Sequence, residues 1–176
     1  MFKFYNVNKR LNATAHEIHG SIVAQTRKPV FYANWCVPDT VEGQFEVLVV
    51  HLSLVIRRMN GGGAEMVSLG QRVAEAFIED LDDSFREMGV GDLTVPKRMK
   101  AASEAYHGRL LAYSDALDSD NGAALCAALE RNIEGGADAP APDIKLMTDY
   151  IMRSAARLST LGLEEISIGR DIFAEI

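Results

Sequence analysis

The chain has 176 residues, of which 48% are hydrophobic, so one domain can bury a core without disulfides or metals. Its 18 Lys and Arg against 25 Asp and Glu give a formal net charge of −7, which disfavours binding to DNA phosphates. Cys36 and Cys126 lie far apart, and neither belongs to a Cys-x-x-Cys pair. They are interpreted as reduced cysteines of a cytosol-like compartment, and a disulfide-stapled mini-protein is excluded.

The charge is unevenly distributed along the chain. Residues 1–30 carry five cations against Glu17 alone, a net charge of +4, which leaves −11 for the rest. Aromatic side chains alternate with the first cations, without an apolar stretch long enough for a signal peptide or a membrane span. We therefore treat residues 1–13 as a basic, aromatic segment. Its predicted membrane-contact residues are Phe2, Lys3, Phe4, Tyr5, Lys9 and Arg10.

The spacing of apolar residues predicts helices along most of the chain. The first helix is predicted from Asn12 or Thr14, either of which suits an N-cap, to Lys28, and Pro29 ends it. A short piece at residues 31–36 then leads into the next helix.

The second predicted helix is the most apolar. Asp39 and Glu42 form a capping-box pattern at its start, the helix continues to Met59, and the glycines at 61–63 end it. Its uncharged stretch, residues 47–56, is half the length of about 20 residues that a membrane span needs. We expect a buried central helix.

Further helical patterns follow. They cover residues 64–88, the stretch from Pro96 through Leu117, residues 121–133 and residues 143–161. Residues 135–142 are rich in Gly, Ala and Pro and form the only linker-like stretch. The alternation at residues 165–168 allows an extended C-terminal tail. The predicted fold class is therefore all-α, with residues 14–176 forming a single-domain bundle of about six helices.

Charged residues mark the third and fourth predicted helices. The outer face of the third is acidic, and we interpret it as a solvated helix face. Its carboxylates are Glu75, Glu79, Asp80, Asp82, Asp83 and Glu87. Lys97, Arg98 and Lys100 stand at the start of the fourth, where the helix dipole disfavours each exposed cation by about 0.3–1 kcal/mol. This basic cluster is the better functional candidate.

The histidines do not form a convincing metal site. His16 and His19 are three apart, whereas the zinc-protease helix needs four, so we expect an exposed helix face. Glu104 and His107 match half of a di-iron motif without a second copy, which leaves a helical metalloenzyme as a minor alternative. His51 is expected to be a hydrogen-bonded core histidine.

Motifs for nucleophilic or phosphate chemistry are also missing from the sequence. It contains no Gly-x-Ser-x-Gly, and the glycines at 61–63 lack the Lys-Ser/Thr of a phosphate loop. We therefore predict a protein without catalytic residues, metal or cofactor.

Two stretches carry a family resemblance. Residues 31–46 with His51, and residues 81–100 with Tyr106, Arg109 and Tyr113, include the runs Arg-Glu-Met-Gly-Val-Gly-Asp and Val-Pro-Lys-Arg-Met-Lys. The pattern resembles the ubiquinol-cytochrome c chaperone family, assembly factors for cytochrome b of respiratory complex III. The resemblance covers about residues 14–118. Gln44 stands where the family is expected to have an arginine.

The resemblance implies a non-catalytic chaperone that binds newly made cytochrome b and promotes its haem acquisition and its incorporation into complex III. It also implies a bacterial form, cytoplasmic or peripheral on the cytoplasmic face of the inner membrane, with the ribosome near the tunnel exit and a small partner chaperone as partners. The alternative is a peripheral membrane-binding helical adaptor without specificity for cytochrome b. The predicted partner-binding residues are Asp39, Phe45, Glu46, Arg86, Glu87, Asp92, Lys97, Arg98, Lys100, Tyr106 and Arg109.

Two features of the sequence agree with such a role. The cluster of Lys97, Arg98 and Lys100 suits ribosomal RNA or anionic lipid. An apolar groove between helices would hold a transmembrane segment of the client, with methionines as adaptable lining, although methionine at helical spacing more often belongs to a core. The methionines concerned are Met59, Met66, Met88 and Met99.

Overall fold

The computed structural model describes residues 2–135 and 140–176, and the side chains of residues 8–135 and 140–176. Within these residues the chain forms helices and no strand, which confirms the predicted all-α, single-domain bundle. The elements are α1 (Phe2–Thr26), a short π-helix η1 (Val30–Asn34), α2 (Val41–Asn60), α3 (Ala64–Glu87), α4 (Val95–Asp118), α5 (Gly122–Asn132), α6 (Ile144–Thr160) and α7 (Leu163–Ile168). None of the described helices is long and apolar enough to cross a membrane.

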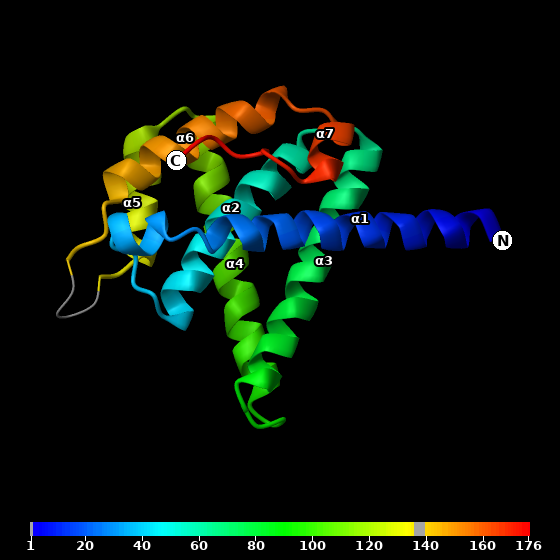
Figure 1. Ribbon diagram of the computed structural model, residues 1–176, viewed down its shortest axis with the longest axis horizontal. Coiled ribbons are helices and arrows are strands. Elements are labelled where there is room, and N and C mark those ends of the chain that lie inside the picture. Colours follow the sequence, from blue (N-terminus) through cyan, green and yellow to red (C-terminus); the bar gives the residue numbers. More distant parts are fainter. Residues whose placement is uncertain (1, 136–139) are drawn as a thin grey trace.

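The helices divide into a body and a projecting hairpin. Helix α2 lies centrally and packs against α1, α3, α4 and α6, while α5 joins α4 to α6. The lower halves of α3 and α4 extend together away from the body, and the N-terminal turns of α1 extend beyond it in another direction (Figure 1). We call α3 and α4 with their connecting turn the α3–α4 hairpin.

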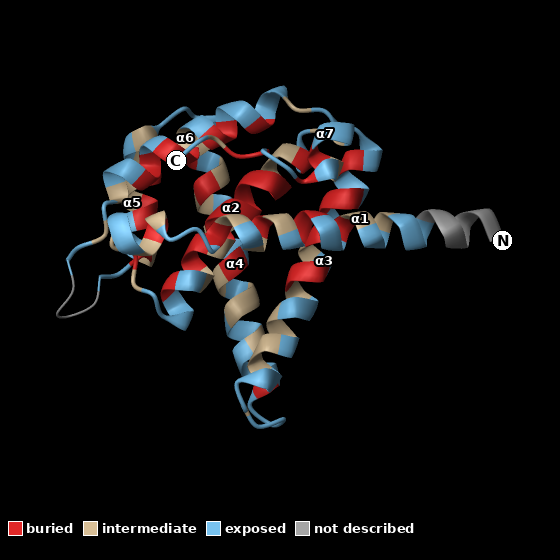
Figure 2. Cartoon of the chain, in the orientation of Figure 1, coloured by how far each residue is buried: buried red, intermediate tan, exposed pale blue. Residues whose placement is uncertain are grey.

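Helix α2 is the buried central helix that the sequence predicts. Every residue from Val49 to Ile56 is buried, and this helix is the most continuously buried part of the chain in Figure 2. Its cap is displaced by one residue, however. Thr40, not Asp39, caps the helix, because its extended backbone (φ −119°, ψ 167°) brings Oγ1 within 3.2 Å of the Gly43 amide nitrogen. The Asp39 carboxylate instead accepts a hydrogen bond from Gln44 Nε2 at 2.7 Å.

The predicted start of the first helix is wrong. Helix α1 begins at Phe2, ten or more residues before the predicted start, and so crosses the boundary placed at residue 13. The reason is tertiary: Asn8 and Asn12 accept hydrogen bonds from Arg72 of α3 rather than capping a helix. The separate role of the segment 1–13 stays a prediction.

The C-terminal segment also differs from expectation. Residues 163–168 form α7 rather than an extended piece, because Ile166 is fully buried and both ends of the helix are capped. The Gly162 amide donates to Glu165 Oε2 at 2.7 Å, and Gly169 ends the helix in the left-handed region (φ 70°). A short alternating pattern is ambiguous by itself, and packing and capping decide it.

Candidate binding groove

An apolar groove of about 460 Å³ lies between α1, α2 and the α3–α4 hairpin. Phe77 is fully buried, whereas Phe45 and Leu81 are only half-buried. Opposite them, α4 presents small side chains, and this lack of bulk leaves the space open. The apolar lining consists of Val23, Val41, Phe45, Leu48, Phe77, Leu81, Phe85, Met88, Ala101, Ala102 and Ala105.

Helical periodicity explains this lining. Phe77, Leu81 and Phe85 follow one another at i, i+4 and i+8 on α3, so they share one face of the helix. Met88 continues the same face to the end of the hairpin. The groove therefore runs from the body outward along the hairpin.

Charged groups surround the apolar surface. Arg27, which follows α1, lines the groove with Asp80 of α3 and Arg98 of α4. The Arg98 guanidinium lies 5.9 Å from the centroid of the Phe85 ring, a cation–π distance. An apolar floor with a polar rim suits an apolar segment flanked by polar residues.

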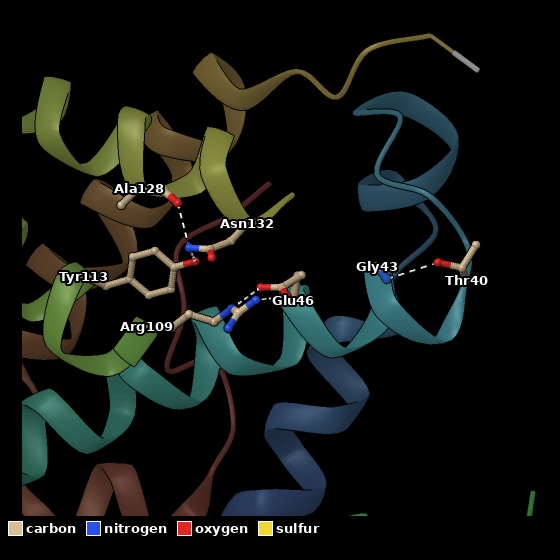
Figure 3. A network of polar contacts seen from close by, with 7 residues as sticks. All are labelled: Thr40, Gly43, Glu46, Arg109, Tyr113, Ala128 and Asn132. Atoms are coloured by element: carbon tan, nitrogen blue, oxygen red, sulfur yellow. Dashed lines mark hydrogen bonds and ion pairs between the residues drawn. The ribbon is translucent and has the colours of Figure 1, made fainter. Parts of the chain in front are cut away.

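A buried ion pair links α2 to α4 beside the groove. The Arg109 guanidinium contacts the Glu46 carboxylate with both arms of the fork, Nε to Oε2 at 2.6 Å and Nη2 to Oε1 at 2.5 Å (Figure 3). Only 19% of the Arg109 side chain and 9% of the Glu46 side chain are exposed. Burial raises the pKa of Glu46, and the hydrogen bonds and charge of Arg109 act in the opposite direction. Arg109 thus favours the ionised form of a carboxyl group whose ionisation burial disfavours.

The same arginine connects the groove with the interior. It lies 5.8 Å from the centroid of the Phe45 ring, which lines the groove. Behind it, Asn132 Nδ2 donates to the Tyr113 hydroxyl at 3.3 Å and to the Ala128 carbonyl at 2.7 Å, so α4 and α5 are joined (Figure 3). Burial raises the pKa of Tyr113 to about 12, so this hydroxyl stays protonated.

Several of the predicted partner-binding residues meet at this groove. Phe45, Glu46 and Arg98 line it, and Arg109 pairs with Glu46. Tyr106 lies beneath it, 3% exposed, with its ring centroid 5.3 Å from that of Phe77. Its position indicates a packing residue that supports the floor.

The other predicted partner-binding residues lie elsewhere. Asp39 lines an adjoining hollow, which shares Arg27 and Gln44 with the groove. The remaining residues are exposed near the turn of the hairpin, outside the groove. They are Arg86, Glu87, Asp92, Lys97 and Lys100.

The methionines divide between groove and core. Met88 is 48% exposed and lines the groove, whereas Met59 and Met66 are buried in the core and Met99 is partly buried. The core interpretation is therefore confirmed for two of the four, and Met88 alone keeps the predicted lining role.

Sequence reasoning missed the alanines of α4. Ala101, Ala102 and Ala105 are unremarkable as single residues, and their spacing on one helix face was the only available signal. They become informative once α4 is seen opposite the bulky side chains of α3.

The comparisons with known proteins place these residues in a family. The family model for the ubiquinol-cytochrome C chaperone matches residues 34–173. The chain belongs to the ubiquinol-cytochrome C chaperone family. Every groove residue named above except Val23 and Arg27 lies inside the matched range.

Individual relatives agree with this membership. The crystal structure of the Cbp3 homolog from Brucella abortus is 34% identical to this chain, with a TM-score of 0.84, covering 99% of this chain and 96% of that one. Ubiquinol-cytochrome c reductase complex assembly factor 1 is 23% identical in Drosophila melanogaster, over 93% of this chain and 64% of the relative. The Xenopus laevis protein is 22% identical, over 81% and 70% respectively. The chain spans just under two thirds of the Drosophila relative.

The prediction that His51 is a hydrogen-bonded core histidine is confirmed. His51 is fully buried, with Nδ1 2.7 Å from the Val47 carbonyl oxygen and Nε2 2.9 Å from the Tyr150 hydroxyl. Burial lowers its pKa to about 4, so the imidazole is neutral at pH 7. It is a structural residue and is not part of the groove lining.

The expected exposed face around His16 and His19 is only half correct. His16 is exposed, whereas His19 is 5% exposed and lies 3.2 Å from Asp80 Oδ2 across the α1–α3 contact. Both side chains face α3, because residues three apart share one side of a helix, but His16 lies at the exposed edge of this contact, with Nε2 3.6 Å from Glu79 Oε2.

The remaining candidates do not form a second site. His107 is exposed, with Nδ1 2.7 Å from the Ser103 carbonyl oxygen, and no group of three possible metal ligands occurs in the part of the chain described. Lys9 and Arg10 are exposed on α1. The side chains of the other predicted membrane-contact residues, Phe2, Lys3, Phe4 and Tyr5, lie outside the described residues.

Proposed function

We propose that this protein is a non-catalytic chaperone for the assembly of ubiquinol-cytochrome c reductase, respiratory complex III, and that its client is newly synthesised cytochrome b. Family membership supports the assembly role, because the Drosophila and Xenopus relatives are named as assembly factors of that complex. The observation that carries the client proposal is the apolar groove beside the α3–α4 hairpin.

The groove suits one face of a helical segment. A volume of about 460 Å³ accepts the side chains along a helix face but not a whole helix, which is the helix-in-groove mode of recognition. Met88 supplies an adaptable, polarizable contact for a varied apolar surface. The charged rim provided by Arg27, Asp80 and Arg98 would contact the polar ends of the segment.

The same proposal covers the later steps of assembly. The chaperone holds cytochrome b while it acquires haem and then releases it to the complex. The proposal includes a contact with the ribosome near the tunnel exit and a small partner chaperone that shares the work. We place this activity in the cytoplasm, at the cytoplasmic face of the inner membrane.

Site-specific photo-crosslinking in the host tests the client. A photoreactive amino acid at Ser84, which lines the groove, is compared with one at Leu111, which is 64% exposed on α4 and outside the groove lining. We expect cytochrome b to be captured from position 84 and not from position 111. Equal capture from both positions, or from neither, would contradict the groove as the client site.

A groove-filling variant tests the role in assembly. Ala102→Phe places a ring in the groove, whereas Ala156→Phe places the same ring on the exposed face of α6. With both variants present at normal levels, we expect assembled complex III to fall in the first strain only, while other respiratory complexes are unaffected. Unchanged complex III after deletion of the whole gene would overturn the proposed function.

A further inference from the structure

The turn of the α3–α4 hairpin presents an unusual apolar residue to solvent. Leu93 is 99% exposed, and Met88 nearby is 48% exposed. The turn between α3 and α4 is the part of the hairpin farthest from the body (Figures 1 and 2). We call residues 86–100 the hairpin apex. Because Leu93 is almost fully exposed, its apolar surface is available to a lipid phase or to a partner.

Two ion pairs and a glycine shape the turn at the apex. Arg86 contacts Asp82 Oδ2 at 2.6 Å and Asp92 Oδ1 at 3.2 Å, and so ties the end of α3 to the turn. Gly89 adopts φ +74°, which permits the sharp exit from α3. Val95, two residues after Leu93, is only 1% exposed. The apex therefore buries one apolar residue, Val95, and exposes another, Leu93.

Basic charge is concentrated around this leucine. The apex carries four cations and two carboxylates, a net charge of +2, whereas the whole chain carries −7. Two of these cations pair with carboxylates next to the apex: Arg86 with Asp82, and Lys100 Nζ with Glu104 Oε1 at 3.8 Å. The first turn of α4 contains no acidic residue. Lys97, Arg98 and Lys100 are all exposed there. An exposed leucine near exposed cations suits the interface of an anionic bilayer, in which acyl chains lie beneath the lipid phosphates.

We propose that the hairpin apex docks on the surface of an anionic lipid bilayer, with Leu93 and Met88 at the acyl-chain boundary and Lys97 and Lys100 at the lipid phosphates. A lipid surface explains the apex better than RNA does, because single-stranded RNA is bound through aromatic stacking, and the exposed apolar residues here are aliphatic. This surface differs from the N-terminal segment predicted to contact membranes.

The groove and the apex are continuous. Phe85, Met88 and Arg98 line the groove, and the last two of these also belong to the apex. Docking by the apex would bring the outer end of the groove to the membrane. Resting on the proposed function, this arrangement gives an apolar client segment a short path between groove and lipid.

Co-sedimentation of the full chain with vesicles tests the docking. Vesicles of phosphatidylcholine alone are compared with vesicles that also contain phosphatidylglycerol. We expect binding only to the anionic vesicles, reduced roughly fivefold or more both by Leu93→Asp and by the double variant Lys97→Gln/Lys100→Gln. The matched controls, Leu111→Asp and Lys145→Gln, change exposed residues of α4 and α6 outside the apex and should bind like the unaltered chain.

Tryptophan fluorescence locates the contact. Leu93→Trp places a second tryptophan at the apex, in addition to the native Trp35, which is 7% exposed. Brominated lipids should quench the fluorescence of the tryptophan at position 93 but not that of a tryptophan introduced by Leu111→Trp. The proposal is overturned if the unaltered chain binds neutral and anionic vesicles equally, or if Leu93→Asp binds anionic vesicles as well as Leu111→Asp does.

Loss of binding through Lys9→Gln/Arg10→Gln alone would overturn it in favour of the N-terminal segment. Lysine variants at the apex that impair ribosome binding and spare vesicle binding would overturn it in favour of RNA. These vesicle assays do not involve cytochrome b. Crosslinking of cytochrome b from position 84 can therefore succeed while the docking proposal fails, and the reverse also holds.

Discussion

The body and the outer turn of the α3–α4 hairpin differ in how far they bury their apolar side chains. In the body, Phe31 is fully buried, with its ring centroid 5.2 Å from that of Trp35, 5.3 Å from His51 and 5.7 Å from Tyr150. In the hairpin, Leu93 is 99% exposed. The difference indicates that the buried helix faces carry the stability of the fold, including the face of α3 around Phe77, and that the outer turn of the hairpin carries exposed surface.

Polar groups follow the same division. His51 in the body is buried and neutral, with both ring nitrogens within hydrogen-bonding distance of a partner. Arg86 in the hairpin forms exposed ion pairs, which contribute little to stability. The pair of Glu46 and Arg109 stands where the two regions join, charged as in the hairpin and buried as in the body.

The largest effect should come from the aromatic cluster of the body. Phe31→Ala removes a ring that contacts four other aromatic rings, and we expect the free energy of unfolding to fall by about 3–5 kcal/mol. Leu93→Ala in the hairpin should change it by about 0.5 kcal/mol or less, because that side chain has no contacts to lose. Denaturant unfolding measures both. Comparable losses would remove the distinction between the two regions.

The junction should come next. Arg109→Gln leaves the Glu46 carboxylate buried without its partner, and we expect a loss of about 2–4 kcal/mol at pH 7, below the upper range for buried pairs because Arg109 is partly exposed. The pKa of Glu46, already raised by burial, should rise further in this variant. Protonation then removes the unpaired charge, so the loss should shrink as the pH falls.

A second variant separates charge from packing at this junction. Glu46→Gln/Arg109→Gln should be more stable than Arg109→Gln alone, because no buried charge remains. Unfolding curves of both proteins across the acidic range decide the point. An Arg109→Gln defect that does not vary with pH would show that lost packing, not the stranded carboxylate, dominates.

The buried histidine should make the body sensitive to acid. The pKa of His51 is about 4 in the folded state against about 6.5 when unfolded, so only the unfolded chain takes up this proton between those values. The stability is therefore complete above pH 6.5 and is lost as the pH falls towards 4, by at most about 3 kcal/mol. His51→Gln should flatten this dependence, whereas His107→Gln, an exposed control, should not. The same slope in all three proteins would contradict the assignment.

The smallest stability effect should come from the basic cluster of the hairpin. Reversing the charges with Lys97→Glu, Arg98→Glu and Lys100→Glu should change the free energy of unfolding by about 1 kcal/mol or less, since all three side chains are exposed. Partner binding should weaken strongly. A thermal melt beside a binding assay tests both statements. If the triple variant unfolds, the cluster is structural.

Much of the fold could be predicted because helical periodicity records which face of each helix is buried. The fourth helix with Pro96 in its first turn and the fully buried His51 both matched the structure. The first helix did not, because the sequence shows that Asn12 suits a cap but not that Arg72 of α3 binds it. Contacts between distant segments carry no local signal.

The candidate site shows the same limit. The sequence singled out Phe45, Glu46 and Arg109, but not that Arg109 pairs with Glu46 across 63 residues. It also did not indicate that Ala102 would line a groove. A groove exists only where small residues of one helix face bulky residues of another, and this is a property of packing.

The charge balance and the apolar spacing by themselves determined an acidic, helical, single-domain protein with a basic cluster at residues 97–100. Both follow from local chemistry, since helix faces and net charge are set by the order of residues. Only the tertiary structure decided that Met88 lines a groove, that Met59 fills the core and that Leu93 stands outside at the apex. Three apolar residues of similar size receive different roles because packing with distant parts of the chain determines which of them water can reach.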